Sequence, residues 1–461
     1  MMSSYTNSFP NLLFPANNCK ISQSDLIKNS KSQKFELDFN VSTSIPFEKD
    51  ILTKLETEFD ATILKHKPTS DINRSSNLCQ DSELNDYISQ ASSAIPPRSI
   101  GLTNCGNTCY LNSCLQCLIA TGPLLALIKS SHSDSSKCVI FNRNNCTTRE
   151  SFCALCGVNS LLREHTKTGN SCFSSFPNAI TPEYFSKNVK DHRLHFNKFY
   201  IPILAVCPSL RMYMQEDAHE FLLGMLSKME DATLLTLYRN RLPPKPIHKI
   251  PPKIAMTNAI RRIFGGQSKY EIKCHACQHV SSREEHWFNL SLDILNARTL
   301  QQCLSNLIRP ETLSGANAYK CPNCKQLRPA ERRCRIKSVP LTLIIQFNRF
   351  SRSQKLDSFV EFPETFNLRN FMEPQTGPPV VYRLYALVNH QGLSCRSGHY
   401  VAFSKRHGRW YLHNDSSVSQ VNQQSVMNQH PYLLFYQLES KLPTSTNPPQ
   451  VSHHSIQFPD H

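Results

Sequence analysis

The sequence contains no run of 18 apolar residues and no block of five or more Lys or Arg residues. The first absence argues against a membrane-spanning helix, which needs about 20 apolar residues. The second argues against a basic arm for nucleic acid. The opening segment, Met1 to Ser8, is polar and lacks the apolar centre of a signal peptide. We therefore expect an intracellular protein, in the nucleus or the cytoplasm, without a membrane partner.

Apolar residues are sparse at both ends of the chain and make up 39% of the whole. Residues 1–96 are rich in Ser, Asn, Lys and Asp, with only weak helical periodicity over 47–64. Such a segment cannot bury enough apolar surface to fold. We predict a largely disordered polar N-terminal tail over 1–96, a folded part over 97–438 and a disordered C-terminal tail over 439–461.

The net charge is +16, which suits nucleic acid, an anionic surface or an acidic partner. A solvated basic surface explains the same number equally well. Because the sequence has neither basic repeats nor stacked aromatic residues among them, nucleic acid is not an expected partner.

The nineteen cysteines are an odd number, and they are many for 461 residues. In a reducing compartment they serve as thiols, metal ligands or catalysts rather than as disulfides.

The residue pattern changes from helical to strand-like along the folded part. A helix is predicted over 215–229 and a Pro/Lys-rich loop over 243–253. Short apolar or alternating segments predict strands, at 341–347, 382–388, 400–404, 409–412 and 431–436. Helices followed by an antiparallel sheet indicate an α+β fold with a cleft between the layers.

The segment 104–112 places a thiol where a turn meets a helix. A Gly/Asn/Thr turn ends at Cys109, and Leu111, Leu115 and Leu118 follow at helical spacing. A thiol on the first turn of a helix faces the positive end of the helix dipole, which favours the thiolate. Cys109 is therefore a candidate nucleophile, although a single cysteine near a helix start is more often structural.

A histidine strand about 290 residues downstream of Cys109 contains a candidate general base, His399. Asn414 or Asp415, at the end of the next predicted strand, would orient the imidazole ring. The backbone N–H of Cys109 and the side-chain amide of Asn104 would receive an oxyanion. Together these residues predict a cysteine hydrolase.

Two Cys-x₂-Cys pairs, Cys274/Cys277 and Cys321/Cys324, are separated by 43 residues. Four thiolates in this arrangement predict one structural zinc ion with no open position for water, whereas the alternative is four buried thiols.

A third pair, Cys153 and Cys156, has apolar residues between and after its cysteines, which favours buried helix thiols over a metal site. Other possible ligands lie near it in the sequence: Cys138, Cys146, His165 and Cys172.

Three motifs in this order resemble those of the ubiquitin-specific proteases, a family of papain-like cysteine deubiquitinating enzymes. Residues 101–113 resemble the family's cysteine box, and residues 215–221 resemble an acidic motif. Residues 398–403 and 410–418 together resemble its histidine box. The resemblance covers about residues 97–438.

The resemblance implies a papain-like fold with a helical thumb, a β-sheet palm and zinc-ribbon β fingers within about residues 263–345. It places five residues in the reaction: Cys109 as nucleophile, His399 as base, Asn414 at the third triad position, Asp415 as its acidic neighbour and Asn104 at the oxyanion. It also implies substrate contacts at Gln215, Asp217, Glu220, Gly398 and Tyr400. Asp217 and Glu220 fall where family members meet arginines of ubiquitin.

Four segments resemble the nucleolar, histone-linked branch of that family and its short relatives: residues 151–156, 263–266, 313–319 and 388–399. This similarity implies a nuclear, and within the nucleus a nucleolar, location. It also implies a polar blocking loop over residues 391–397.

We expect a hydrolase that cleaves the bond between the C-terminal glycine of ubiquitin and a substrate lysine. Its partners would be ubiquitin and ubiquitinated proteins, and the enzyme would act as a monomer. The alternative is a catalytically silent, zinc-stabilised ubiquitin-binding module, although Cys109, His399 and Asn414 are all present.

Overall fold

The computed structural model describes residues 78–133, 138, 153–167, 194–196, 199–201, 206–211, 213–241, 255–350, 355–394 and 397–439. All of them belong to the second of two compact units, Thr53–His461. The weakly periodic segment 47–64, the loop predicted over 243–253 and the tail beyond residue 439 lie outside the described residues.

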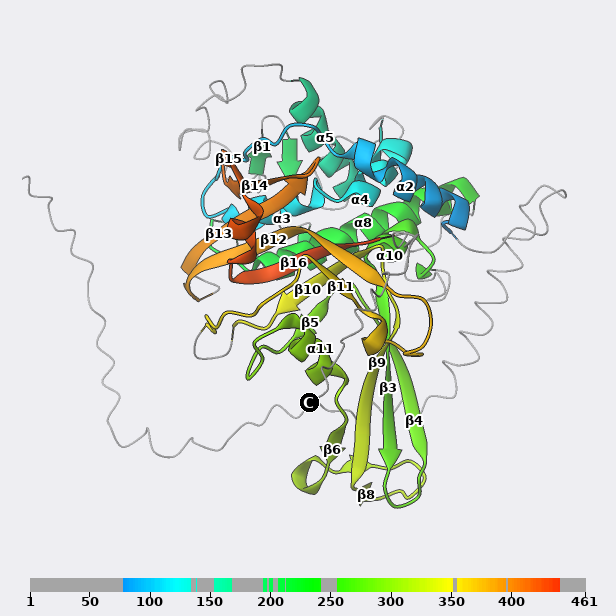
Figure 1. The fold of residues 1–461 in the computed structure, drawn as a ribbon. Helices are drawn as coiled ribbons and strands as arrows, with labels where there is room; N and C mark the ends of the chain where they lie inside the picture. Colours follow the sequence, from blue (N-terminus) through cyan, green and yellow to red (C-terminus); the bar gives the residue numbers. More distant parts are fainter. Residues whose placement is uncertain are drawn as a thin grey trace, which may run out of the picture. The chain divides into compact units, whose positions relative to one another are not determined.

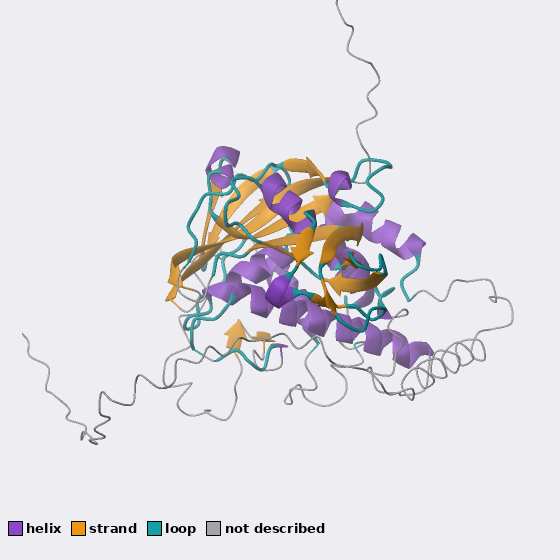
Figure 2. Cartoon of the chain, turned by 90° about the horizontal axis from the view of Figure 1, so that it is seen from below, coloured by secondary structure: helices purple, strands orange, loops and turns teal. Residues whose placement is uncertain are grey.

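Helices form one layer of the described part (Figures 1 and 2). Their bounds are Asp81–Ala94 for α2, Cys109–Leu118 for α3, Gly122–Ser131 for α4, Ala154–Lys167 for α5, Ala218–Arg241 for α8 and Ala259–Phe264 for α10. All ten residues of α3 are buried. In the described part no helix alone is long and apolar enough to cross a membrane, and α3 with α4, bent by 81°, meets that test only as a pair.

Helix α2 lies within the predicted N-terminal tail, so the predicted start of the folded part at residue 97 is too late. It packs against α4, where a Cβ added to Gly122 would lie 2.6 Å from the Ala91 carbonyl oxygen. The backbone N–H of Gln80 donates to Glu83 Oε2 at 2.7 Å and satisfies a donor at the helix start. Few apolar residues mark this helix, and its contacts with distant segments stabilise it.

The larger sheet has eight strands in the order β15-β14-β13-β12-β16-β10-β5, with β11 also paired to β12. The strand bounds are Leu290–Leu292 for β5, Thr342–Phe347 for β10, Thr365–Asn367 for β11, Val381–Ser394 for β12, Ser397–Arg406 for β13, Arg409–Asn414 for β14, Ser417–Val421 for β15 and Pro431–Leu438 for β16. All pairs are antiparallel except β10 with β5. Short elements flank it: η6 (Arg369–Phe371) and α12 (Gln423–Met427).

The sheet separates two apolar cores, because successive side chains of a strand point to opposite faces. Ala386 and Val388 of β12 join the core formed with α3, α4 and α8. Leu387 between them joins a second core, which contains α11 (Leu300–Ile308). The five strands predicted from the sequence are all present.

Two predicted boundaries change in the structure. Helix α8 begins at Ala218, three residues later than predicted, and continues to Arg241. The expected polar loop over 391–397 is largely a β-hairpin, since β12 and β13 pair as far as Ser394 and Ser397.

A second sheet extends away from the larger one (Figure 1). Its order is β4-β3-β9-β6, with bounds Val280–Trp287, Gly266–Cys274, Ala330–Ser338 and Glu311–Leu313. At its far end lie η5 (Gly315–Asn317), β7 (Tyr319–Lys320) and β8 (Leu327–Arg328). We call residues 266–338, without β5 and α11, the fingers. They lie within the predicted range of 263–345, which also contains β5 and most of β10 of the larger sheet. A separate hairpin consists of β1 (Leu194–Phe196) and β2 (Phe199–Ile201).

Candidate active site and metal centres

Cys109 is the first residue of α3, as predicted, and a turn held by side chains precedes it. Asn104 Oδ1 accepts hydrogen bonds from the backbone N–H groups of Gly106 at 3.0 Å and Thr108 at 3.1 Å. Gly106 has φ +99°, a conformation that favours glycine. Thr108 Oγ1 in turn accepts from the backbone N–H of Cys105 at 2.9 Å. These bonds determine where the thiol enters the helix.

The Cys109 thiol is 2% exposed, and burial raises its pKa above the ordinary value. Hydrogen bonds from the backbone N–H groups of Tyr400, Tyr110 and Cys109 itself oppose the effect of burial. The lowered pKa expected from the helix start is therefore wrong for this resting arrangement. Tyr400 follows His399 directly, so its N–H places the thiol beside the histidine strand.

His399 and Asn414 lie on the neighbouring strands β13 and β14. His399 Nε2 is 2.7 Å from Asn414 Oδ1. Since Asn414 Oδ1 can only accept, Nε2 carries the proton, and Nδ1 is the nitrogen left to take a proton from a thiol. In this arrangement the His399 ring makes its hydrogen bond to Asn414. Among the described contacts, neither ring nitrogen is hydrogen-bonded to Cys109.

Asp415, directly after β14, connects the end of that strand to the turn before Cys109. Its Oδ1 accepts from Asn112 Nδ2 at 2.7 Å and its Oδ2 from Asn104 Nδ2 at 3.0 Å. His399 Nε2 is 3.9 Å from Asp415 Oδ2. One carboxylate thus aligns the end of β14, which carries Asn414, with the helix that carries the thiol. Asn104 gives one of its two amide N–H bonds to this contact.

The sequence reasoning did not identify Asn112. It is 2% exposed and lies three residues after Cys109, on the inward side of α3. A buried polar side chain needs a hydrogen-bond partner, and a polar residue on the apolar helix that follows Cys109 was the only feature of the sequence that could have pointed to Asn112. The partner, Asp415, is 303 positions away in the sequence and could not be read from the helix.

Gln215 bridges the segment before α8 and the histidine strand. Its Nε2 donates to the Gly398 carbonyl oxygen at 2.5 Å, and its Oε1 accepts from the Gly398 N–H at 2.6 Å. Gly398 has φ +155°, and an added Cβ would lie 2.5 Å from His390 Nε2. The pair therefore determines the position of the backbone beside His399.

The remaining predicted substrate residues differ in accessibility. Both carboxylate oxygens of Asp217 accept from the Tyr432 hydroxyl, at 2.8 and 3.0 Å. Glu220 is exposed and accepts from the Ser209 hydroxyl. Tyr400 is 2% exposed, and its ring packs 4.6 Å from that of His390. A substrate contact of Tyr400 would therefore come from its backbone.

The four finger cysteines converge as predicted, and their sulfur atoms all lie within 4.8 Å of one another. The two pairs have the same local geometry. The backbone carbonyl oxygens of Cys274 and Cys321 each accept a hydrogen bond from the N–H group four residues further along the chain. The donors are Gln278 at 3.0 Å and Lys325 at 2.9 Å. Gln278 and Lys325 both have φ +59°. Two equivalent turns that present four sulfurs to one point fit a tetrahedral metal ion.

The third pair, Cys153 and Cys156, is buried as predicted, but it belongs to a second cluster of possible metal ligands. His132, Cys138, Cys153 and Cys156 also have their ligand atoms within 4.8 Å of one another. Of the neighbours considered from the sequence, only Cys138 joins it. Cys146 and Cys172 lie outside the described residues, as does the side chain of His165.

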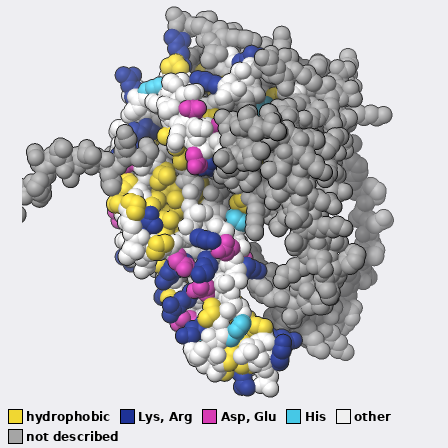
Figure 3. All heavy atoms as spheres, turned by 90° about the vertical axis from the view of Figure 1, so that its right-hand side faces the viewer, with side chains coloured by type: hydrophobic (Ala, Val, Ile, Leu, Met, Phe, Trp, Pro, Cys, Tyr) yellow, Lys and Arg dark blue, Asp and Glu magenta, His cyan; other side chains and the backbone are white. Residues whose placement is uncertain are grey.

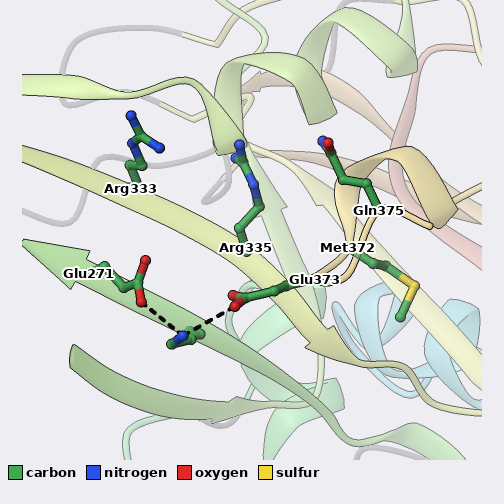
Figure 4. A pocket seen from close by; sticks show the side chains of 7 residues that line it. Glu271, Arg333, Arg335, Met372, Glu373 and Gln375 are labelled. Carbon is green, nitrogen blue, oxygen red and sulfur yellow. Dashed lines mark hydrogen bonds and ion pairs between the residues drawn. The ribbon is translucent and has the colours of Figure 1, made fainter.

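A separate pocket of about 230 Å³ lies at the base of the fingers (Figure 4). Lys269 Nζ sits between Glu271 at 2.8 Å and Glu373 at 3.1 Å. Arg333 and Arg335 of β9 also line it. None of the candidate catalytic residues lines this pocket. Charges of both signs alternate along this part of the surface (Figure 3).

The site has the parts of a cysteine hydrolase. A thiol lies at a helix start, an amide orients an imidazole beside it, and the Asp415 carboxylate links the two segments. The family model described as ubiquitin carboxyl-terminal hydrolase matches residues 100–436. The chain therefore belongs to the ubiquitin carboxyl-terminal hydrolase family.

The chain is similar to several curated proteins of this family. It is 31% identical over 365 residues to mouse ubiquitin carboxyl-terminal hydrolase 17-like protein C, which covers 78% of this chain and 59% of that protein. It is 32% identical over 339 residues to human ubiquitin carboxyl-terminal hydrolase 42, covering 73% and 22%. The chain thus spans 59% of the length of the first of these relatives.

A solved structure of the SAGA Ubp8/Sgf11/Sus1/Sgf73 DUB module bound to ubiquitin aldehyde has the same fold. The TM-score is 0.55 at 26% sequence identity, over 76% of this chain and 71% of that one. The papain-like α+β architecture predicted from the sequence is confirmed.

Proposed function

We propose that the chain is a thiol-dependent ubiquitin hydrolase that cleaves the bond between the C-terminal glycine of ubiquitin and a lysine amine. Family membership and a structural relative bound to ubiquitin aldehyde support this proposal. The observation that carries it is the 2.7 Å contact of His399 Nε2 with Asn414 Oδ1, beside the helix start at Cys109. This contact leaves Nδ1 to serve the thiol.

The reaction begins with transfer of the Cys109 proton to His399 Nδ1. Because burial raises the pKa of the thiol, the proton leaves only when an imidazole is positioned to take it. The sulfur then forms a bond to the carbonyl carbon, and the π electrons move onto the oxygen. The backbone N–H of Cys109 and the second amide N–H of Asn104 stabilise that oxyanion.

The intermediate collapses when the bond from carbon to the lysine nitrogen breaks. His399 returns its proton to the leaving amine and a thioester remains on Cys109. His399 then removes a proton from water, and the hydroxide attacks the thioester carbon. The carbon–sulfur bond breaks, the ubiquitin carboxylate is released, and the proton on His399 returns to the Cys109 sulfur. Asn414 keeps the His399 ring in one tautomer throughout, and Asp415 holds the end of β14 against α3.

Residues beside the thiol suit the slender C-terminal tail of ubiquitin. Gln215 positions Gly398, and the exposed Glu220 carboxylate is available to an arginine of the tail. The Asp217 carboxylate already accepts a hydrogen bond from the Tyr432 hydroxyl, so Asp217 would influence the substrate indirectly, by positioning Tyr432. Remote contacts of this kind place the scissile bond without changing the chemistry.

The finger cysteines would hold one structural zinc ion. Four sulfurs within 4.8 Å satisfy its tetrahedral preference, and they leave no position for a reacting water. None of the residues of β4 is buried, so a metal ion would stabilise the far end of the small sheet. The stabilised fingers would then contact the globular body of ubiquitin.

The decisive experiment is reaction of the purified chain with a ubiquitin whose C-terminus carries an electrophile, followed by peptide mapping. We expect one adduct, on Cys109, and none with Cys109→Ala. The competing function, a silent ubiquitin-binding module, predicts ubiquitin binding without an adduct. An adduct on another cysteine would remove Cys109 from the mechanism.

A further inference from the structure

The cluster of His132, Cys138, Cys153 and Cys156 is buried to an unusual degree for four polar or polarisable side chains. Their exposed fractions are 2%, 3%, 3% and 4%. His132 directly follows α4, Cys153 and Cys156 lie at the start of α5, and Cys138 lies between these helices in the sequence. All four ligand atoms approach within 4.8 Å of one another. Three sulfurs and one imidazole nitrogen thus meet at a point remote from solvent.

His132 brings an unsatisfied nitrogen into this cluster. Its Nδ1 is 2.8 Å from Ser131 Oγ, whereas its buried Nε2 has no hydrogen-bond partner among the described residues. A buried polar atom left without a partner costs about 1–3 kcal/mol, so native proteins rarely retain one. A metal ion at the centre of the cluster would satisfy it. The Ser131 hydroxyl would then hold the ring in the correct tautomer, as outer-shell groups do for histidine ligands.

The surrounding backbone is arranged as at a metal knuckle. The N–H of Cys156 points at Cys153 Sγ at 3.5 Å. The fingers show the same contact, from the N–H of Cys324 to Cys321 Sγ at 3.4 Å. Amide-to-sulfur bonds of this kind favour the thiolate that a metal requires.

Two further bonds hold the end of α4 against α5. Asn159 Nδ2 donates to the His132 carbonyl oxygen at 2.6 Å, and the Arg163 guanidinium donates to the Ser133 carbonyl oxygen at 2.9 Å. The backbone that carries His132 is therefore held against α5, at whose start Cys153 and Cys156 lie.

We propose that His132, Cys138, Cys153 and Cys156 form a second zinc site, separate from that in the fingers. Three thiolates and one imidazole are a ligand set typical of structural zinc. All four positions are filled by protein and the cluster is buried, so the site stabilises and does not catalyse. It joins the end of α4 to the start of α5 and holds Cys138 beside both. The site does not depend on the hydrolase activity.

The test is the zinc content of the full chain, purified and dialysed against metal-free buffer, by mass spectrometry. We expect two zinc ions per chain in the wild type. The Cys153→Ser/Cys156→Ser variant should hold one, and so should Cys321→Ser/Cys324→Ser. The control Cys303→Ser, which alters a buried cysteine outside both clusters, should retain two.

One zinc ion in the wild type, lost in the finger variant and retained in Cys153→Ser/Cys156→Ser, would overturn the proposal. Should the variants not fold, X-ray absorption at the zinc edge of the wild type decides the matter. Two sites predict a nitrogen ligand among sulfurs, from His132, whereas the finger site alone predicts sulfur only.

Discussion

At the scale of single residues, the Cys109 thiol is subject to two opposing effects. The helix start and nearby N–H groups favour the thiolate, and burial favours the thiol. Burial is the larger effect, so the resting side chain is protonated at neutral pH. The nucleophile is therefore generated when His399 Nδ1 reaches it, which makes the orientation of that ring the controlling feature of the site.

Cys109→Ala removes the only group proposed to form the covalent bond. We expect kcat/KM for a ubiquitin–fluorophore conjugate to fall by at least about a thousandfold, with ubiquitin affinity unchanged. Steady-state fluorescence and a binding titration measure the two quantities. Cys303→Ala, which deletes a thiol in α11, is the control that should retain turnover. Normal turnover in Cys109→Ala would contradict the mechanism.

Asn414 acts on His399 by accepting one hydrogen bond, which permits a matched pair of variants. Asn414→Ala should lower kcat by about a hundredfold, because the ring loses its orientation. Asn414→Asp supplies an oxygen in the same place and should retain most of the activity. Single-turnover measurements with a saturating conjugate test this prediction. An equal fall in kcat in both variants would show that the acceptor oxygen of Asn414 does not orient His399.

His390 makes folding stability depend on pH. Burial lowers its pKa from 6.5 to about 4, Lys355 acts in the same direction, Asp357 opposes both, and His399 lowers it further. Above pH 6.5 His390 is neutral in the folded and the unfolded chain, and the free energy of unfolding is not reduced by its titration. As the pH falls from 6.5 towards 4, only the unfolded chain takes up the proton, so the free energy of unfolding decreases. The loss is up to about 3 kcal/mol.

Urea midpoints at pH 7.5 and pH 5 measure this effect in the wild type and in His390→Gln. We expect the variant to be less sensitive to the change in pH, even if it is less stable at both values. The same difference between the two pH values in both proteins would show that His390 does not titrate as described.

At the scale of elements, strand β13 connects the helical layer to the sheet at the point where the chemistry takes place. Gln215, before α8, makes both of its side-chain bonds to Gly398 on this strand. Asp415, after β14, makes its bonds to Asn104 and Asn112 in and before α3. The thiol and the base are thus aligned from both sides by groups that do not react.

Gln215→Ala removes two hydrogen bonds beside His399, each contributing about 1 kcal/mol. We expect kcat/KM to fall by about tenfold or more, because each 1.4 kcal/mol corresponds to a factor of ten. Gln215→Glu has the same length but replaces the donor with a carboxylate oxygen facing the Gly398 carbonyl. It should lose at least as much at neutral pH. Progress curves that match the wild type for both variants would exclude a positioning role.

At the scale of the whole molecule, the described part divides into layers that surround the thiol and fingers that extend from them. The two candidate metal centres follow this division. One lies at the far end of the fingers, and the other lies between α4 and α5. Neither cluster contains a proposed catalytic residue, so loss of metal at either place would act on stability and binding before it acted on the chemistry.

Cys321→Ser should release zinc from the fingers and reduce ubiquitin binding more than chemistry. We expect KM for a ubiquitin conjugate to rise by about tenfold with little change in kcat, because a remote contact contributes to binding. Cys334→Ser, in β9 of the same sheet but outside the cluster, is the matched control. A fall in kcat without a change in KM would show that the fingers influence the reaction itself.

The sequence by itself predicted the nucleophile and the base of the proposed triad. It limited the orienting group to Asn414 or Asp415, and the family resemblance favoured Asn414. Nucleophile, base and orienting amide lie in short motifs whose backbone context is local: a turn before a helix and the ends of adjacent strands. The Cys-x₂-Cys pairs of the fingers were equally visible, since a metal knuckle is formed by consecutive residues. All five predicted strands lie in the segments that the pattern indicated, because alternation or continuous burial marks a strand directly.

Only the tertiary structure decided which distant residues meet. Asp415 binding Asn104 and Asn112, Gln215 clamping Gly398 and His132 joining three cysteines each depend on chain segments that the fold brings together. It also decided the state of Cys109, because a helix dipole can be read from the sequence whereas burial cannot. Local motifs determine which groups are present, and long-range packing determines their partners and their charge.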